Sequence, residues 1–178
     1  KCHMTGNVVV RNGREQVELT LTLDFQTEKP NAVVPVPLKG MRLSKSSLDG
    51  KPPPWGPDTE KWTLQLSEAG SHQLVLTSLI PLQRNGAERK FSISRLPASA
   101  ITSLELSIPG TVLNPIITGY GNVTVQKGTQ PETQLVTAPA LGILNSLELI
   151  WQTTDERAGT SRELEGDIRI TCDNTQAD

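Results

Sequence analysis

The sequence predicts an all-β protein, an antiparallel β-sandwich of about 12 strands. Three observations support this: apolar and polar residues alternate along most of the chain, turn-forming dipeptides separate the alternating runs, and no stretch has the apolar spacing of an amphipathic helix. Strands at regular spacing with no helices between them pair antiparallel and close as a sandwich or barrel. One extended double-sheet sandwich is one form that this architecture can take.

The clearest predicted strand lies at residues 16–25, where Val17, Leu19, Leu21 and Leu23 alternate with polar residues. Because side chains of a strand point to its two faces in turn, one face is apolar and the other faces water. The same alternation recurs in shorter runs, at residues 62–66, 91–93, 104–108, 123–125, 147–151 and 168–172.

Turn chemistry falls between these runs. The predicted turns are Asn12-Gly13, Asp49-Gly50, Asn85-Gly86 and Pro109-Gly110. Asn, Asp and Gly tolerate the positive φ that tight hairpin turns require. The run 34–37 has proline at alternate positions, so one side of it lacks amide donors, which predicts an edge strand or a crossover between sheets.

The domain organisation has two possible forms. Residues 1–112 form the predicted main β-sandwich, and residues 113–178 either extend the same sheets or form a small second β unit. The segment Gly6–Gly13 resembles Gly121–Gly128. Two explanations are open: the opening of a hairpin is duplicated, or a strand that ends in a glycine turn recurs by chance. The chain starts at Lys1 with neither an initiator Met nor a signal peptide, as expected of a segment of a longer protein.

Charge and composition argue against two classes of partner. The formal net charge of the 178 residues is −2 with both signs interspersed, so there is no basic stripe for nucleic acid and no polybasic segment for a lipid surface. No apolar run approaches the roughly 20 residues of a spanning helix. The remaining partner classes are other domains of the same protein or another protein, with a glycan as a further option.

A set of strand and turn motifs also resembles a known group of proteins. These motifs are Val34-Pro35-Val36-Pro37-Leu38, Leu48-Asp49-Gly50-Lys51-Pro52, Gly70-Ser71-His72-Gln73-Leu74-Val75-Leu76 and Leu104-Glu105-Leu106-Ser107-Ile108-Pro109-Gly110. Their order resembles the β-rich ectodomains of large, uncharacterised bacterial envelope and surface proteins. The resemblance spans about residues 6–154 and implies an exported β-sandwich, periplasmic, cell-surface or extracellular, with structural or adhesive work. It also implies other domains of the same protein or another envelope protein as partners.

The two cysteines lie near the two ends of the chain. Cys2 and Cys172 each share strand parity with apolar neighbours, so both thiols are expected to point inward. If the first and last strands lie close together, a disulfide can join them. The alternative is two buried free thiols that behave as small apolar groups.

Catalytic and metal-binding patterns are absent from the sequence. Its two histidines, His3 and His72, form no ligand-spaced pair, and neither lies beside a nucleophile motif. His72 is predicted at a surface strand position. No catalytic residue, metal site or cofactor is therefore expected, and the chain is predicted not to be an enzyme. Scattered carboxylates leave a fragment of a β-sandwich hydrolase as an alternative, because such folds bring distant carboxylates together.

One proline-rich segment is a candidate binding feature. Prolines around Trp55, including Pro54 and Pro57, favour a stiff, extended backbone that presents the indole as a platform for a sugar ring. Alternatively, Trp55 folds back and caps the core, whereas Trp62 and Trp151 are predicted within the core. The predicted function is a non-catalytic structural or protein-interaction module, with a carbohydrate-binding module using Trp55 as the other binding alternative.

Overall fold

The computed structural model of the chain describes residues 1–36, 41–57, 62–97, 99 and 102–154. The regular secondary structure of its described part consists of strands alone, which confirms the predicted all-β sandwich. The strands are β1 (Cys2–Arg11), β2 (Arg14–Thr27), β3 (Ala32–Pro35), β4 (Leu43–Leu48), β5 (Thr63–Leu66), β6 (Gly70–Pro81), β7 (Gln83–Asn85), β8 (Glu88–Ile93), β9 (Thr102–Pro109), β10 (Val112–Ile117), β11 (Thr124–Lys127), β12 (Thr133–Ala138) and β13 (Leu147–Thr153).

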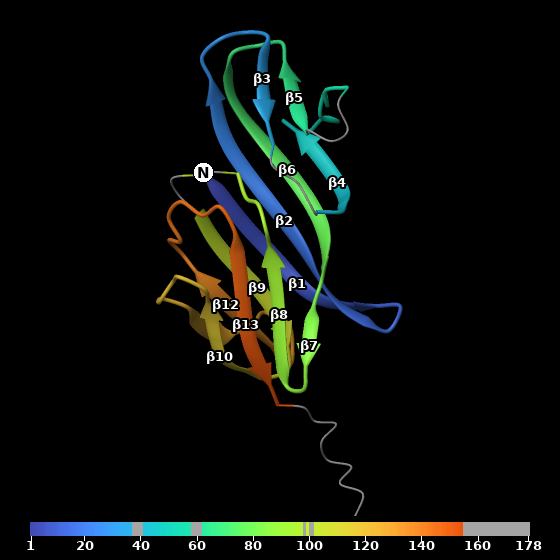
Figure 1. The fold of residues 1–178 in the computed structure, drawn as a ribbon, viewed down its shortest axis with the longest axis vertical. Coiled ribbons are helices and arrows are strands. Elements are labelled where there is room, and N and C mark those ends of the chain that lie inside the picture. The colour runs from blue at the N-terminus through green and yellow to red at the C-terminus, as the bar shows by residue number, and fades with distance from the viewer. Residues whose placement is uncertain (37–40, 58–61, 98, 100–101, 155–178) are drawn as a thin grey trace, which may run out of the picture.

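Three sheets build the molecule. The main sheet has seven strands in the order β11-β12-β9-β1-β2-β6-β4, the front sheet has four in the order β10-β13-β8-β7, and the cap sheet pairs β3 with β5. Figure 1 shows the front and cap sheets on the same side of the main sheet, at its two ends. The strands after residue 112 join both larger sheets: β11 and β12 continue the main sheet next to β9, and β10 and β13 lie beside β8.

Most neighbouring strands are antiparallel, as predicted, and one central pair is parallel. β1 pairs antiparallel with β2 on one side and parallel with β9 on the other, from Cys2 opposite Thr102 to Asn7 opposite Ser107. β2 and β6 are the longest paired strands and run from Gln16 opposite Pro81 to Thr27 opposite Gly70. They carry the main sheet beyond the front sheet to the end where the cap sheet folds over it (Figure 1).

The core lies between the main sheet and the two smaller sheets. Inward positions of β2 confirm the predicted alternation, since Val17, Leu19 and Leu21 are fully buried while the residues between them are partly exposed. Phe91 and Trp151 approach from the front sheet and pack edge to face, with ring centroids 6.5 Å apart. Burying such a large side chain stabilises the fold by roughly 1.5–3 kcal/mol relative to exposing it.

The predicted turns are present, and one of them lies one residue later than predicted. Asn12 and Gly13 both have positive φ and join β1 to β2 as a two-residue loop, which matches the twist of the strands. In the turn between β7 and β8 the loop residues are Gly86 and Ala87, because Asn85 is still paired with Glu88. Val34 and Pro35 belong to an edge strand, as predicted, since they end β3 of the two-stranded cap sheet. Residue 37 of the proline-containing run lies outside the described part.

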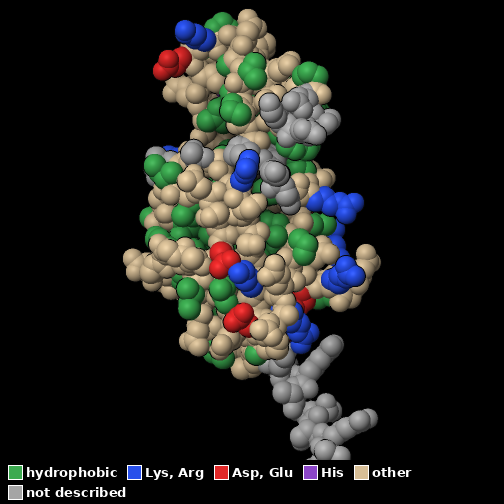
Figure 2. Space-filling model, viewed as in Figure 1, with side chains coloured by type: hydrophobic (Ala, Val, Ile, Leu, Met, Phe, Trp, Pro, Cys, Tyr) green, Lys and Arg blue, Asp and Glu red, His purple; other side chains and the backbone are tan. Residues whose placement is uncertain are grey.

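The face of the main sheet away from the front and cap sheets is called the open face here. Figure 1 shows no described strand against it. Two of its central rows run across β1, β2 and β6 and contain no charged side chain: His3, Thr22 and Val75 in one row, and Thr5, Thr20 and Thr77 in the next. On the opposite side of the molecule, Figure 2 shows acidic and basic side chains in the lower half. On the front sheet, Lys90 of β8 and Glu148 of β13 form an ion pair at 2.6 Å.

Candidate functional site

A groove of about 1360 Å³ opens at the end of the sandwich where the front sheet meets the main sheet. It is called the mouth groove here, and its lining includes Val10 and Glu15 of the β1–β2 hairpin, Arg84 and Arg89 of β7 and β8, and Val125 and Lys127 of β11. Hairpin ends from both sheets form its walls, so the sandwich topology positions the groove. It offers both apolar side chains and cationic groups to a ligand.

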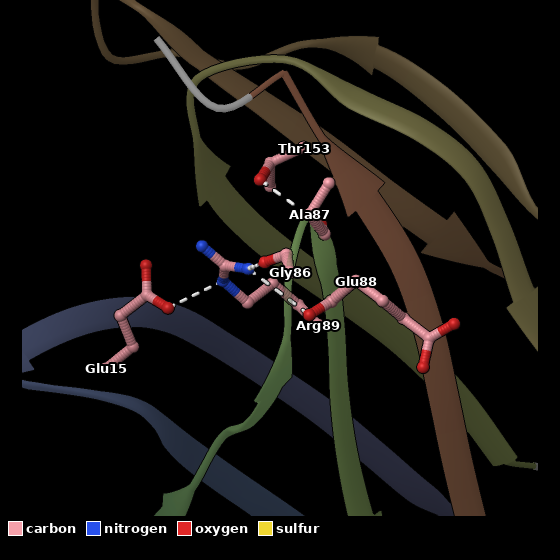
Figure 3. Close-up of polar contacts among 6 residues, drawn as sticks. All are labelled: Glu15, Gly86, Ala87, Glu88, Arg89 and Thr153. Atoms are coloured by element: carbon pink, nitrogen blue, oxygen red, sulfur yellow. Dashed lines mark hydrogen bonds and ion pairs between the residues drawn. The ribbon is translucent and has the colours of Figure 1, made fainter. Parts of the chain in front are cut away.

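The most buried charged group of the groove is Arg89, which is 4% exposed. Its Nε donates to Glu15 Oε2 at 2.6 Å, and its Nη1 donates to the carbonyl oxygens of Gly86 at 2.7 Å and Glu88 at 3.2 Å. Figure 3 shows the guanidinium directed at Glu15 and at the turn carbonyls. A buried guanidinium needs such partners, because an uncompensated charge in the interior is strongly unfavourable.

This ion pair connects the two layers of the sandwich. Glu15 belongs to the main sheet and Arg89 to the front sheet, where it lies opposite Trp151. Thr153 lies beside this pair, and its Oγ1 donates to the carbonyl of Ala87 at 3.4 Å (Figure 3). Its amide donates to the same carbonyl at 2.9 Å. Arg89 was not predicted as a site residue, although a signal was present: it has the same strand parity as the apolar Phe91.

The proposed binding residue Trp55 is only half-buried, but its side chain is on the inner side of the cap sheet. It is bridged to Leu64, which is fully buried, and partners in an antiparallel bridge share a face. Its ring packs edge to face on Trp62 with centroids 5.1 Å apart and an interplanar angle of 80°. Pro54 and Pro57 are exposed on either side of it.

The other two tryptophans have different environments. Trp151 is 1% exposed, as predicted for a core residue. Trp62, predicted within the core, is partly buried and packs against the core cluster. It lies just before β5, at the end of the short cap sheet.

Cys2 is buried on the inner face of β1 and has no disulfide partner among the described residues. Burial raises its pKa to about 11 despite the opposing charge of the amino terminus, so it is a weak nucleophile. Cys172 lies outside the described residues, and the disulfide between the two stays a prediction.

The two histidines lie on different faces of the main sheet. His72 is not at the surface as predicted: its side chain is 12% exposed, its Nδ1 is 2.9 Å from Asp49 Oδ2, and its ring lies 5.6 Å from that of Phe25. The hydrogen bond with His72 and another from the amide of Gln73 lower the pKa of Asp49. This contact ties the turn after β4 to β6.

His3 is on the open face, with its Nδ1 2.6 Å from Ser103 Oγ. Among the described residues, no hydrogen bond joins His3 to a carboxylate that would orient it as a general base, as a triad requires. In the same part of the chain, no group of three His, Cys, Asp or Glu side chains is placed to hold a metal ion, and no helix is long and apolar enough to cross a membrane.

Comparison with known proteins identifies a shared fold and no family. No family model and no curated protein matches the sequence. The M1 zinc metallopeptidase of Deinococcus radiodurans superimposes with a TM-score of 0.53 at 16% identity, over 84% of this chain and 41% of that chain. A mutant of that peptidase gives a TM-score of 0.52 at 17% identity over the same shares of the two chains.

A more distant structure is native yeast LTA4 hydrolase, with a TM-score of 0.48 and 8% identity over 85% of this chain and 28% of that one. This chain spans 41% of the length of the bacterial peptidase that it matches. At such low identity, the superposition on the bacterial peptidase shows a common β fold.

Proposed function

We propose that this chain is a non-catalytic structural or protein-interaction module of a larger exported bacterial envelope or surface protein, and that its open face packs against a neighbouring domain. The observation that carries the proposal is the uncharged centre of that face, where it crosses β1, β2 and β6. Thr5, Thr20 and Thr77 form one row, and Thr20 and Thr77 share a hydrogen bond between their hydroxyl groups at 3.2 Å, which satisfies them within the sheet.

An uncharged, self-satisfied sheet face suits an interface core. Charged residues are depleted at the centres of protein interfaces, because burying an unpaired charge is unfavourable. Charged groups surround this centre: Glu105 of β9 lies beside Thr5 and Lys45 of β4 beside Thr77, at the two ends of one row. Glu18, which pairs with Arg11 at 3.3 Å, lies in the row next to it. A neutral centre with a charged rim is the arrangement expected of a docking surface.

The test is the accessibility of a cysteine placed on the open face. In a Cys172→Ser background, Thr20→Cys is expected to react with a maleimide at least about 10-fold faster in the isolated chain than in the longest natural polypeptide that carries it. Ser92→Cys, at an exposed position of β8, is the matched control and should react equally in both. Equal rates for Thr20→Cys in the two contexts would contradict the docking role.

A second candidate function is a β unit of a zinc peptidase, and the superposition on the M1 zinc metallopeptidase favours it. In this case the longest natural polypeptide would bind zinc and hydrolyse peptides. Elemental analysis for zinc and an assay against a peptide library test both properties. A polypeptide with neither property would speak against this candidate and leave the structural module.

The carbohydrate-binding alternative requires Trp55 to present a ring face to a sugar. Its inward side and its contact with Trp62 favour a capping role at the edge of the core instead. Iodide quenching of tryptophan emission in the presence of oligosaccharides tests this alternative, because a bound sugar would protect Trp55.

A further inference from the structure

Sheet edges are the places where a β protein can accept another strand, because their outer N–H and C=O groups are unpaired. Natural edges are protected by proline, by register shifts, by short strands or by a covering segment. Five of the six edge strands in the described part carry such a feature: Pro35 in β3, Pro115 and a register shift in β10, a register shift in β4, the short length of β7, and the segment Pro54–Gly56 bonded to β5.

The remaining edge strand, β11, is one residue longer than β7 and has none of the other features. Its four residues, Thr124–Lys127, contain no proline and are all exposed, and its register with β12 is regular. In the part of the chain that the structure describes, β11 pairs only with β12. It is therefore the least protected edge of the described fold.

The ladder between β11 and β12 determines which backbone groups face outward. The amide of Gly128 donates to the carbonyl of Thr133 at 2.9 Å, so these two residues form a hydrogen-bonded pair. Such pairs alternate with non-bonded pairs along an antiparallel ladder. The N–H and C=O groups of Val125 and Lys127 therefore point to the open edge, where a further strand can bond to them.

The side chains of the same two residues line the mouth groove. Val125 is 37% exposed and Val10, which also lines the groove, is 68% exposed, so a partner residue placed there removes apolar surface from water. Lys127 lies two residues further along the same face and favours an acidic neighbour in the opposing strand.

We propose that β11 accepts an extended peptide segment of a partner protein as an added strand, with an apolar residue opposite Val125 and an acidic residue opposite Lys127. In an antiparallel pairing the partner has the order acidic, any residue, apolar. The inference rests on the proposed interaction role and names the chemistry of one partner, but it uses a different surface from the open face.

The first test is fluorescence anisotropy with the full chain and a fluorescein-labelled peptide, TTETVTT. Saturable binding is expected, and N-methylation of the peptide's valine, which removes the N–H that would face β11, should weaken it at least about 10-fold. Val125→Pro should weaken binding similarly, since its own N–H faces the open edge and the ladder to β12 does not need it. If Val125→Pro unfolds in a urea titration, the N-methylated peptide decides the question.

The second test exchanges charge. Lys127→Glu should lower the affinity for TTETVTT by about 3- to 10-fold at low salt, and this variant should bind TTKTVTT more tightly than TTETVTT. The control is Lys45→Glu, on the opposite edge strand β4, which should change neither affinity. The proposal would be overturned if no binding were detected at about 1 mM peptide, or if neither N-methylation nor Val125→Pro changed the affinity.

A third outcome is a dimer of the chain that Val125→Pro abolishes and that the peptide does not disrupt. This would assign the edge to a second copy and also overturn the proposal. The maleimide test of the open face does not involve β11, so failure of the strand-addition proposal and failure of the proposed function are distinguishable.

Discussion

Removal of either member of the Arg89–Glu15 pair should destabilise the fold, and the two losses should not add. Glu15→Ala removes the Glu15 carboxylate from the charged side chain of Arg89, which is 5% exposed. Arg89→Met keeps apolar volume but removes the hydrogen bonds to Gly86 and Glu88 together with the ion pair.

The magnitude follows from burial. Breaking a fully buried ion pair destabilises by about 3–5 kcal/mol. Because the Glu15 side chain is 34% exposed, water can partly replace it, and we expect about 2 kcal/mol for Glu15→Ala. Arg89→Met should lower the free energy of unfolding by about 2 kcal/mol, since the carbonyls of Gly86 and Glu88 can then bond to water. The double variant should resemble the single Arg89→Met variant, which gives a coupling energy of about 1.5–2 kcal/mol.

Urea unfolding followed by tryptophan emission measures these differences, because the buried indole of Trp151 lies in the strand next to Arg89. All four proteins of the double-mutant cycle should unfold with the same dependence of free energy on urea concentration. A coupling energy below about 0.5 kcal/mol, or an Arg89→Met variant more stable than wild type, would refute the claim that this pair holds the two layers together.

Three further predictions concern other parts of the fold. Gly56→Ala should destabilise the cap sheet and shift tryptophan emission, because the added carbon would collide with Thr63 Oγ1; Gly121→Ala, with no atom near the added carbon, is the control. In a background without the second cysteine, Cys2 should react with a thiol reagent at pH 8 at least about 100-fold more slowly in native protein than in urea, since burial raises its pKa; similar rates would contradict its burial. The pKa of the Asp49 carboxyl is lowered in the fold, so its stabilisation is present above the ordinary pKa and is lost as the pH falls below about 4. Stability against pH should therefore fall less steeply in that range for Asp49→Asn, and identical slopes would contradict the contact.

Local features of the fold were predictable from the sequence. Alternation along β2 gave the correct inward set because a strand with one covered face must place every second residue in the core. Asn12-Gly13 predicted the first hairpin because few other residue pairs adopt positive φ twice in succession. These signals depend only on neighbours in the chain.

Long-range features were not predictable from the same signals. The parallel pairing of β1 with β9 depends on how distant segments meet, and a pattern of period two does not distinguish parallel from antiparallel neighbours. The partial burial of His72 depends on a turn that is distant in sequence, whose Asp49 carboxylate contacts the His72 ring. The mouth groove likewise combines hairpin ends from separate parts of the chain, so its residues share no motif.

The central position of β1 has a consequence for how the chain folds. Its hairpin partner β2 follows at once, but its other neighbour β9 carries Ser103, which lies 100 residues beyond His3. The β1–β2 hairpin and β6 can associate early, while the remaining edge of β1 must wait for closure of this long loop. Folding rates fall as contacting residues lie further apart in sequence. The slow step is therefore expected to be the arrival of β9 at β1, and until then the β1 edge of the hairpin is unpaired.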